Sequence, residues 1–82
     1  MNYYVYVLKS LEKKSVTYVG STNNLNNRIK LHNDGKGAKF TRGRKWKLIY
    51  MEKKSSKNEA ISREYYIKNN RPLRNKIKSK YK

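Results

Sequence analysis

The sequence is poor in the residues on which most catalytic and metal-binding chemistry depends. Its 82 residues include no cysteine and a single histidine, His32. These absences exclude disulfides, thiolate nucleophiles, thiolate zinc sites and His-rich metal clusters. The only acidic residues are Glu12, Asp34, Glu52, Glu59 and Glu64. A two-metal nuclease site needs clustered carboxylates, so any metal chemistry here must rely on one or two.

Long apolar runs are also missing. No segment approaches the roughly 18 apolar residues that a membrane-spanning helix needs, and no signal-peptide pattern opens the chain. A chain of 82 residues has enough material for one small core. We therefore expect a single domain over residues 1–82 that is soluble, cytoplasmic and not bound to a membrane.

Positive charge is what the chain has in excess. It carries 22 lysines and arginines against 5 acidic residues, a formal net charge of +17. The isoelectric point of 10.3 exceeds the value of about 9 that marks many nucleic-acid-binding domains. Anionic membranes would instead require a basic helix with a wide apolar face, and none is apparent. Nucleic acid, DNA above all, is the expected partner, which also fits an association with the nucleoid.

Hydrophobic patterning predicts an α+β domain with the order β-β-α-β-α-α. The predicted strands are Tyr3–Leu11, Val16–Gly20 and Trp46–Glu52. The predicted helices cover about Leu25–Asn33, a stretch from the capping box at Ser56–Glu59 to about Asn69, and about Leu73–Lys80. Pro72 separates the last two helices because proline cannot continue a helix. We expect a small three-stranded, mainly antiparallel sheet with helices packed on it.

Two polar residues fall on the inward side of the first helix. Leu25 and Ile29 must face the sheet, and Arg28 and His32 lie at the edge of the same stripe. One interpretation is that Arg28 lays its stem across the rim of the core, with its guanidinium in water. A histidine at the edge of a core, with one satisfied hydrogen bond, is equally ordinary. The alternative is that both residues face a functional site.

A carboxylate occupies the inward side of the second helix. Ala60, Ile61 and Ile67 mark the expected inner stripe, and Glu64 falls in its middle. An unpartnered buried carboxylate costs several kcal/mol. Glu64 therefore needs a metal, a hydrogen-bond cluster or an ion pair with a basic residue, and the spacing does not choose among them.

Tyrosine is unusually frequent, with eight residues beside one phenylalanine and one tryptophan. Tyr4 and Tyr6 share one face of the first strand, and Tyr18 and Gly20 share one face of the second. Phenylalanine would pack as well without needing a hydroxyl partner, although tyrosine is also an ordinary strand former. Gly20 either allows a close approach to the sheet or marks the end of its strand.

Several short motifs occur together in a fixed order. They are Tyr4-Val5-Tyr6, then Tyr18 to Thr22 with Asn24, Leu25, Arg28, His32 and Asn33, then Lys36 to Arg42, then Asn58-Glu59-Ala60 with Arg63, Glu64 and Lys68, and finally Arg71 to Asn75. Through these motifs the chain resembles the GIY-YIG nuclease superfamily, specifically its small stand-alone bacterial group. The resemblance covers almost the whole chain and implies the GIY-YIG fold.

The resemblance also implies roles for residues of the first two strands and the first helix. Tyr6 would orient or deprotonate the attacking water, with Tyr18 as its partner. Gly20 would leave room beside the site. Arg28 would contact the scissile phosphate, and His32 would assist Arg28 and the phosphate or water. Which of Tyr6, Tyr18 and His32 takes the proton is left open.

Two further roles come from the last two helices. The resemblance implies that Glu64 is the ligand of a single Mg²⁺ or Mn²⁺ ion and that Asn75 braces the site. One glutamate is enough for Mg²⁺, which keeps several waters and also binds phosphate oxygens. Tyr6 can act as a base only if the metal or Arg28 lowers its pKa, and the positive field favours a shift in that direction.

The remaining basic and aromatic residues are candidates for gripping nucleic acid. These candidates are Lys39, Phe40, Arg42, Arg44, Lys45, Lys76, Lys78 and Lys80. Phe40 is a possible platform for an unpaired base, whereas Trp46 is expected mostly in the core. No recognition helix is evident, so DNA structure or a protein partner would direct cleavage.

Two other readings stay open. The first is a cationic DNA- or RNA-binding protein that keeps this fold without catalysis, and the second is a ribosome- or RNA-associated factor.

Overall fold

The computed structural model describes residues 2–80. The elements are β1 (Tyr3–Ser10), β2 (Thr17–Thr22), α1 (Leu25–Asn33), β3 (Trp46–Lys54), α2 (Lys57–Lys68) and α3 (Arg71–Lys80). This is the predicted α+β class and the predicted order. No helix within residues 2–80 has both the length and the apolar character needed to cross a bilayer.

The three strands form one antiparallel sheet with β1 in the centre, in the order β2-β1-β3. The register places Tyr6 of β1 directly opposite Gly20 of β2 on one side and Met51 of β3 on the other. The pairing of β1 with β3 shifts between Val7 and Leu8. Because β2 is an edge strand, the side chains near Gly20 lie at a border of the sheet.

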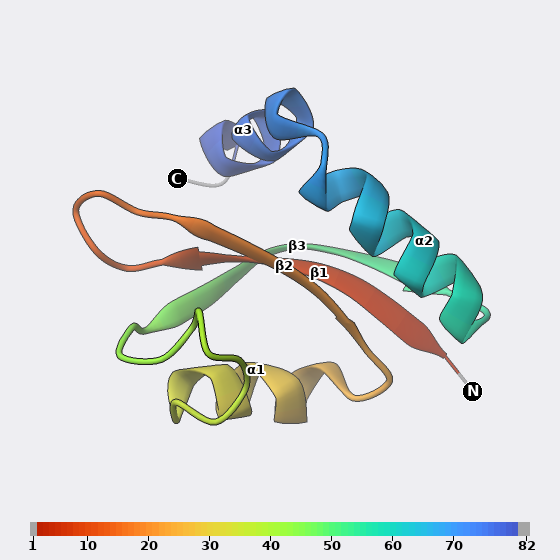
Figure 1. The fold of residues 1–82 in the computed structure, drawn as a ribbon, viewed down its shortest axis with the longest axis horizontal. Helices are drawn as coiled ribbons and strands as arrows, with labels where there is room; N and C mark the ends of the chain where they lie inside the picture. Colours follow the sequence, from red (N-terminus) through yellow and green to blue (C-terminus); the bar gives the residue numbers. More distant parts are fainter. Residues whose placement is uncertain (1, 81–82) are drawn as a thin grey trace.

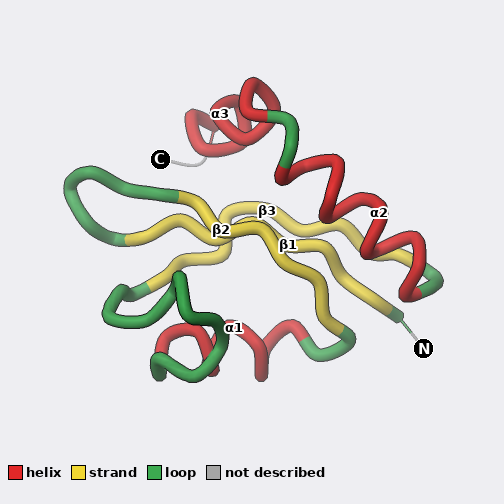
Figure 2. Tube along the Cα trace, viewed as in Figure 1, coloured by secondary structure: helices red, strands yellow, loops and turns green. Residues whose placement is uncertain are grey.

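The two faces of the sheet are covered by different helices. Figure 1 shows α1 on one face and α2 and α3 on the other, and Figure 2 shows the loop after α1 on the α1 side. Side chains alternate along a strand, so β1 contributes to two cores. Val5 and Val7 pack with residues of α2 and α3. Tyr6 and Leu8 pack with Trp46 and, from α1, the partly buried Leu25 and Ile29.

Several element ends differ from those predicted. β2 continues past Gly20 to Thr22, and β3 continues past Glu52 to Lys54, because both remain paired with the start of β1. α3 begins at Arg71 rather than Leu73. The Asn70 side chain accepts a hydrogen bond from the Leu73 amide, and a proline is tolerated in the first turn of a helix.

The predicted inner stripe of α2 is too wide. Ala60 and Ile67 are buried, but Ile61 is 47% exposed, so its assignment to the inner face is wrong. A sheet of three strands is about 10 Å across, no wider than one helix. Only a narrow stripe of α2 is covered for this reason, and Glu64 lies at its edge rather than in its middle.

Candidate functional site

Three aromatic rings from three elements meet on the face of the sheet that α1 covers. Tyr6 and His32 are both almost fully buried, and the Tyr6 hydroxyl lies 2.8 Å from His32 Nε2. The Tyr18 ring centroid lies 4.9 Å from that of His32 and 6.4 Å from that of Tyr6. Three of the predicted site residues therefore form one packed cluster.

Gly20 provides the space that this cluster occupies. A Cβ atom at Gly20 would lie 2.6 Å from Cζ of Tyr6 and 3.2 Å from Cε2 of Tyr18. The first distance is shorter than non-bonded carbon atoms tolerate, so no other residue fits without moving the Tyr6 ring. Gly20 therefore leaves room for the rings of Tyr6 and Tyr18.

The loop after α1 supplies two residues that the sequence analysis did not identify as part of the site. Thr41 is fully buried, and its Oγ1 lies 2.9 Å from His32 Nδ1. A Cβ atom at Gly37 would lie 2.8 Å from Cγ of His32. The sequence signal is that both residues lie within the Lys36–Arg42 motif, in which only Lys39, Phe40 and Arg42 are predicted site residues. Trp46 is buried, as expected, and its indole nitrogen donates to the Thr41 carbonyl at 3.0 Å.

Burial sets the protonation of this cluster. Burial raises the pKa of Tyr6. The charges of Tyr18 and Glu64 also raise the pKa of Tyr6, and only the charge of Arg28 lowers it. Arg28 lowers the pKa of Tyr6, as expected of a positive charge, but the net shift is upward because desolvation of the phenolate outweighs the Arg28 charge. Burial and then the charge of Arg28 lower the pKa of His32. At neutral pH the cluster holds a neutral phenol and a neutral imidazole.

Arg28 lies beside the cluster, at the edge of the sheet. It is half-buried on α1 and lines a cavity of about 290 Å³ together with Ser21 of β2 and Lys57 of α2. Within residues 2–80, its guanidinium makes no ion pair or hydrogen bond, since each acidic side chain is bound to another group. The cavity therefore presents uncompensated positive charge.

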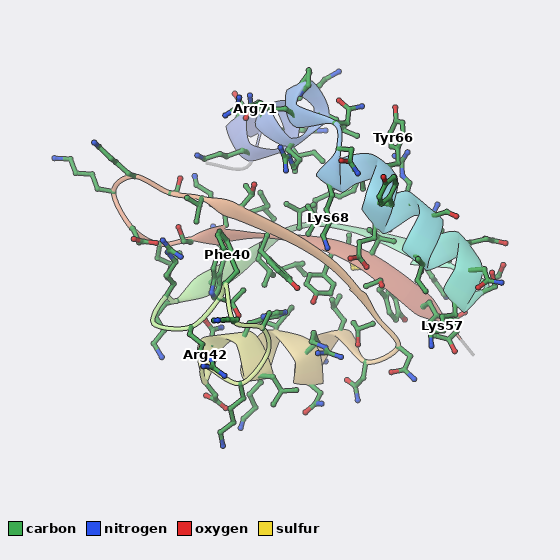
Figure 3. All side chains as sticks on the ribbon, in the orientation of Figure 1. Phe40, Arg42, Lys57, Tyr66, Lys68 and Arg71 are labelled. Atoms are coloured by element: carbon green, nitrogen blue, oxygen red, sulfur yellow. The ribbon has the colours of Figure 1, made fainter. Side chains whose placement is uncertain are left out.

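Glu64 reaches this edge of the sheet from the opposite face. One carboxylate oxygen accepts a hydrogen bond from the Ser21 hydroxyl at 2.6 Å, and the other pairs with the Lys68 ammonium at 2.8 Å. The Glu64 side chain is 22% exposed. Lys68 also lies 6.0 Å from the Tyr18 ring centroid, and Figure 3 shows Lys68 directed from α2 toward the sheet. The ion pair that the sequence left open is present.

Phe40 extends the aromatic cluster outward. Its ring is 50% exposed and stacks on Tyr18 with a centroid distance of 6.2 Å and an interplanar angle of 21°. The Arg44 guanidinium lies 5.3 Å from the Phe40 centroid. Asn75, by contrast, is exposed on α3, and within residues 2–80 no hydrogen bond links it to the cluster. The structure does not bring Asn75 to the site.

Two of the predicted basic residues contact the turn of the β1–β2 hairpin. Arg44 of the loop pairs with Glu12 at 2.5 Å, and Lys78 of α3 donates to the Ser15 carbonyl at 2.6 Å. The turn therefore lies between the loop on one face and α3 on the other (Figure 1). Lys13 and Lys14, which the sequence analysis did not single out, are exposed in this turn.

The other predicted basic residues are exposed on the loop and on α3. They are Lys39, Arg42, Lys45, Lys76 and Lys80. Of these, Lys45 donates to the Asn33 carbonyl at 3.2 Å. Figure 3 shows Arg42 on the loop beside α1 and Arg71 on α3, across the sheet from the loop.

Comparison with known proteins identifies the class. A model of the GIY-YIG catalytic domain matches residues 2–78. The chain therefore belongs to the GIY-YIG family, a superfamily of nucleases that act on nucleic acid.

The relatives belong to a small stand-alone bacterial group. UPF0213 protein CPE1444 of Clostridium perfringens is 59% identical over 66 residues, which are 79% of this chain and 69% of the relative. UPF0213 protein BLi00048/BL00536 of Bacillus licheniformis is 47% identical over 81 residues, 98% of this chain and 78% of the relative. The solution structure of UPF0213 protein BH0048 from Bacillus halodurans matches with 41% identity and a TM-score of 0.57, covering 96% of this chain and 84% of that one.

Proposed function

We propose that the chain is a metal-dependent endonuclease that hydrolyses DNA phosphodiester bonds. Cleavage has low sequence specificity and is directed by DNA structure or by a protein partner, as in DNA repair or recombination. The observation that carries the proposal is the convergence of Tyr6, Tyr18, Arg28 and His32 with Glu64 at one edge of the sheet. A net charge of +17 supports a polyanionic substrate.

Arg28 is the residue that holds the scissile phosphate. A guanidinium binds two phosphate oxygens at once, and its planar fork fixes their orientation. Two observations support this role: the Arg28 charge has no ionic partner among residues 2–80, and Arg28 shares a cavity with Lys57. Lys57 then neutralises a neighbouring phosphate of the same strand.

Glu64 is the residue that would hold a single Mg²⁺ or Mn²⁺ ion. Its two oxygens are hard donors, and one of them already binds a cation, the Lys68 ammonium, so the site suits positive charge. Within residues 2–80 no group of three or more acidic or histidine side chains is placed to hold an ion. Mg²⁺ fits a single carboxylate because it retains waters and takes phosphate oxygens. When bound, the ion would polarise the phosphoryl group and neutralise charge on the leaving oxygen.

The remaining residues place and activate water. The Tyr6 hydroxyl orients the water in line with the bond to be broken. The water loses a proton, its oxygen bonds to phosphorus, and the bond from phosphorus to the 3′ oxygen breaks. The products carry a 5′-phosphate and a 3′-hydroxyl. Lys68 must release Glu64 before the ion binds there.

One observation favours a second function. The Glu64–Lys68 ion pair satisfies the carboxylate without any metal. On this reading the chain is a cationic DNA- or RNA-binding protein that keeps the fold without catalysis. Binding would then show a steep salt dependence and no requirement for a divalent ion.

Nicking of supercoiled plasmid and cleavage of branched DNA distinguish these functions. Each assay is run in Mg²⁺ or Mn²⁺ and again with EDTA, and binding to DNA and RNA is measured on the same samples. Glu64→Gln removes the carboxylate charge, whereas Glu59→Gln makes the same change at an exposed site on the same helix, where the side chain accepts a hydrogen bond from Ser55.

The nuclease proposal expects cleavage to fall on the order of 100-fold or more in Glu64→Gln, while binding persists and Glu59→Gln behaves as wild type. EDTA should abolish cleavage in every sample. Equal cleavage by Glu64→Gln and wild type would contradict the proposal. Binding by every sample with cleavage by none would favour the second function.

A further inference from the structure

The buried imidazole of His32 has a hydrogen-bonding partner at each nitrogen, and Thr41 is one of them. We infer that Thr41 holds His32 in the tautomer with hydrogen on Nδ1, so that Nε2 accepts the hydrogen of the Tyr6 hydroxyl. Resting on the proposed nuclease function, His32 is then the final acceptor of the proton of the attacking water. Thr41 is a positioning residue, because it acts through His32.

The surroundings of the Thr41 hydroxyl fix its single hydrogen. Its oxygen lies 2.9 Å from the Ala38 carbonyl oxygen and 2.9 Å from His32 Nδ1, and it accepts from the Ala38 amide at 3.2 Å. A carbonyl oxygen can only accept. If the hydroxyl hydrogen pointed to Nδ1, two oxygens would face each other at 2.9 Å with no hydrogen between them. The hydrogen therefore goes to Ala38, and His32 Nδ1 must be the donor to Thr41.

The Tyr6 hydroxyl requires the same tautomer. It is buried, and its hydrogen-bond partner within residues 2–80 is His32 Nε2 at 2.8 Å. When Nδ1 carries the hydrogen, the Nε2 lone pair accepts from Tyr6. In the opposite tautomer Nε2–H would point at the Tyr6 oxygen and leave the phenolic hydrogen without an acceptor, at a cost of about 1–3 kcal/mol. The two ends of the imidazole thus give one consistent assignment.

The doubly protonated imidazole is excluded at rest. The ionisable groups that face His32 are Tyr6 of β1, Tyr18 of β2 and Arg28 of α1, and no carboxylate within residues 2–80 is bonded to the ring. Burial of the ring and the positive charge of Arg28 both oppose a second proton. His32 is therefore an unprotonated base, available to accept one proton.

This arrangement lets Tyr6 pass on a proton without first becoming a phenolate. The water proton moves to the Tyr6 oxygen while the Tyr6 proton moves to His32 Nε2. The water oxygen forms its bond to phosphorus, and the electron pair of the breaking bond goes to the 3′ oxygen, which takes a proton from solvent. The imidazolium that results keeps Nδ1–H bonded to Thr41. The raised pKa of Tyr6 is then no obstacle.

Nitrogen-15 NMR of the ring tests the assignment directly. His32 is the only histidine, so histidine-labelled protein gives one pair of ring-nitrogen signals. Near pH 8 we expect wild type to show a protonated Nδ1 and an unprotonated Nε2. Thr41→Val has nearly the same shape without the hydroxyl, and it should populate the Nε2–H tautomer. Thr41→Ser should restore the wild-type pattern.

Two results would overturn the inference. One is an Nε2–H tautomer in wild type, and the other is an unchanged tautomer in Thr41→Val that gives a folded amide spectrum. Neither measurement needs DNA, so the tautomer assignment is tested even if the proposed nuclease function fails.

Cleavage assays then test the consequence for catalysis. We expect Thr41→Val to cleave DNA roughly 10-fold or more slowly with unchanged DNA affinity, and Thr41→Ser to stay near wild type. Thr17→Val, which makes the same change on β2 away from His32, is the matched control and should retain wild-type cleavage. Wild-type cleavage by a Thr41→Val protein whose tautomer has changed would exclude His32 as the proton acceptor.

Discussion

Gly20 and Gly37 contact the two central rings of the site from different directions. Gly20 lies against Tyr6 and Gly37 against His32, and an added Cβ atom would approach ring carbons within 3.0 Å in both cases. Neither glycine has a positive φ, so lack of space, not backbone conformation, requires glycine. The rings can therefore hold the positions of their hydrogen bond only because neither Gly20 nor Gly37 has a side chain.

We predict that Gly20→Ala and Gly37→Ala each lower the free energy of unfolding by about 1–3 kcal/mol, the usual cost of overpacking a core. Each should also displace its ring and reduce cleavage. Urea denaturation measures the first effect, and the His32 ring-nitrogen signals measure the second. Ser79→Ala, at an exposed position of α3, is the control. Wild-type stability in both glycine variants would contradict the packing described for these rings.

The protonation of His32 gives the protein a distinct pH dependence. The ordinary pKa of 6.5 applies to the unfolded chain, while burial and Arg28 lower the pKa of His32 in the folded state. Between these two values the unfolded chain binds more protons. The folded state is therefore most stable, with respect to His32, above pH 6.5, where the imidazole is neutral in both states. This stability is lost as the pH falls through the folded pKa of His32.

We predict that the free energy of unfolding decreases as the pH falls from 7 toward 5. No other side chain has its ordinary pKa in this range, so His32→Gln should flatten the dependence. Urea titrations at several pH values measure it, and NMR of the single imidazole gives the folded pKa directly. A folded pKa at or above 6.5 would show that the imidazole is not buried as described.

At the scale of elements, α2 is fastened to β3 by an ion pair away from the site. Arg63 Nε and Nη2 donate to the two carboxylate oxygens of Glu52 at 2.8 and 2.9 Å. Tyr50 and Lys54 bind the same carboxylate. Burial alone would raise the pKa of Glu52, but these three partners lower it to about 2. The pair therefore orients the helix that carries Glu64.

A depressed carboxylate pKa stabilises the fold above the unfolded value of 4.5 and ceases to do so as the pH falls toward 2. We predict a second loss of stability in this window. Arg63→Gln should cost about 1.5–3 kcal/mol at pH 7, the range for hydrogen bonds to charged groups, and should weaken the acid transition. Glu59→Gln on the same helix should change neither. Unchanged stability in Arg63→Gln would show that α2 is held by its apolar contacts alone.

Local signals were sufficient to predict most of the elements. Ser56 caps α2, as the capping box predicts, and the two tyrosine-bearing strands pair in one antiparallel sheet, as expected. The exposure of Ile61 could not be predicted, because it depends on the width of the sheet beneath α2. The face from which Glu64 approaches depends likewise on how α2 crosses the edge of β2.

The site was predicted where helical or strand spacing fixes a direction, as at Tyr6 and His32. It was not predicted where a loop folds back. Thr41 contacts His32 only because the chain after α1 returns over the helix, and no periodicity in the sequence encodes that return. The net direction of the Tyr6 pKa shift was not predicted for a related reason. Net charge can be read from the sequence, whereas the degree of burial cannot.

At the scale of the whole molecule, the candidate site and the hairpin turn with Lys13 and Lys14 are two separate regions. The molecule is 35 Å in its longest dimension, which matches about ten phosphates along one DNA strand at 3.4 Å each. The site lies along the edge of β2, and the hairpin turn with its flanking cations lies at one end of β2. A DNA strand that passes Arg28 and continues along β2 would therefore reach the hairpin lysines.

The salt dependence of DNA binding tests this path. The logarithm of the binding constant falls linearly with the logarithm of salt concentration, with a slope of about −0.9 for each phosphate contact on duplex DNA. Lys14 is exposed in the hairpin turn, whereas Lys53 is exposed at the other end of the sheet, where it pairs with Tyr4. We predict that Lys14→Gln makes the slope shallower by about 0.9 and that Lys53→Gln leaves it unchanged. Both variants remove one charge, so they alter the overall field equally. Equal changes in slope would mean that the net charge attracts DNA without a defined path, and the hairpin end would then have no special part in binding.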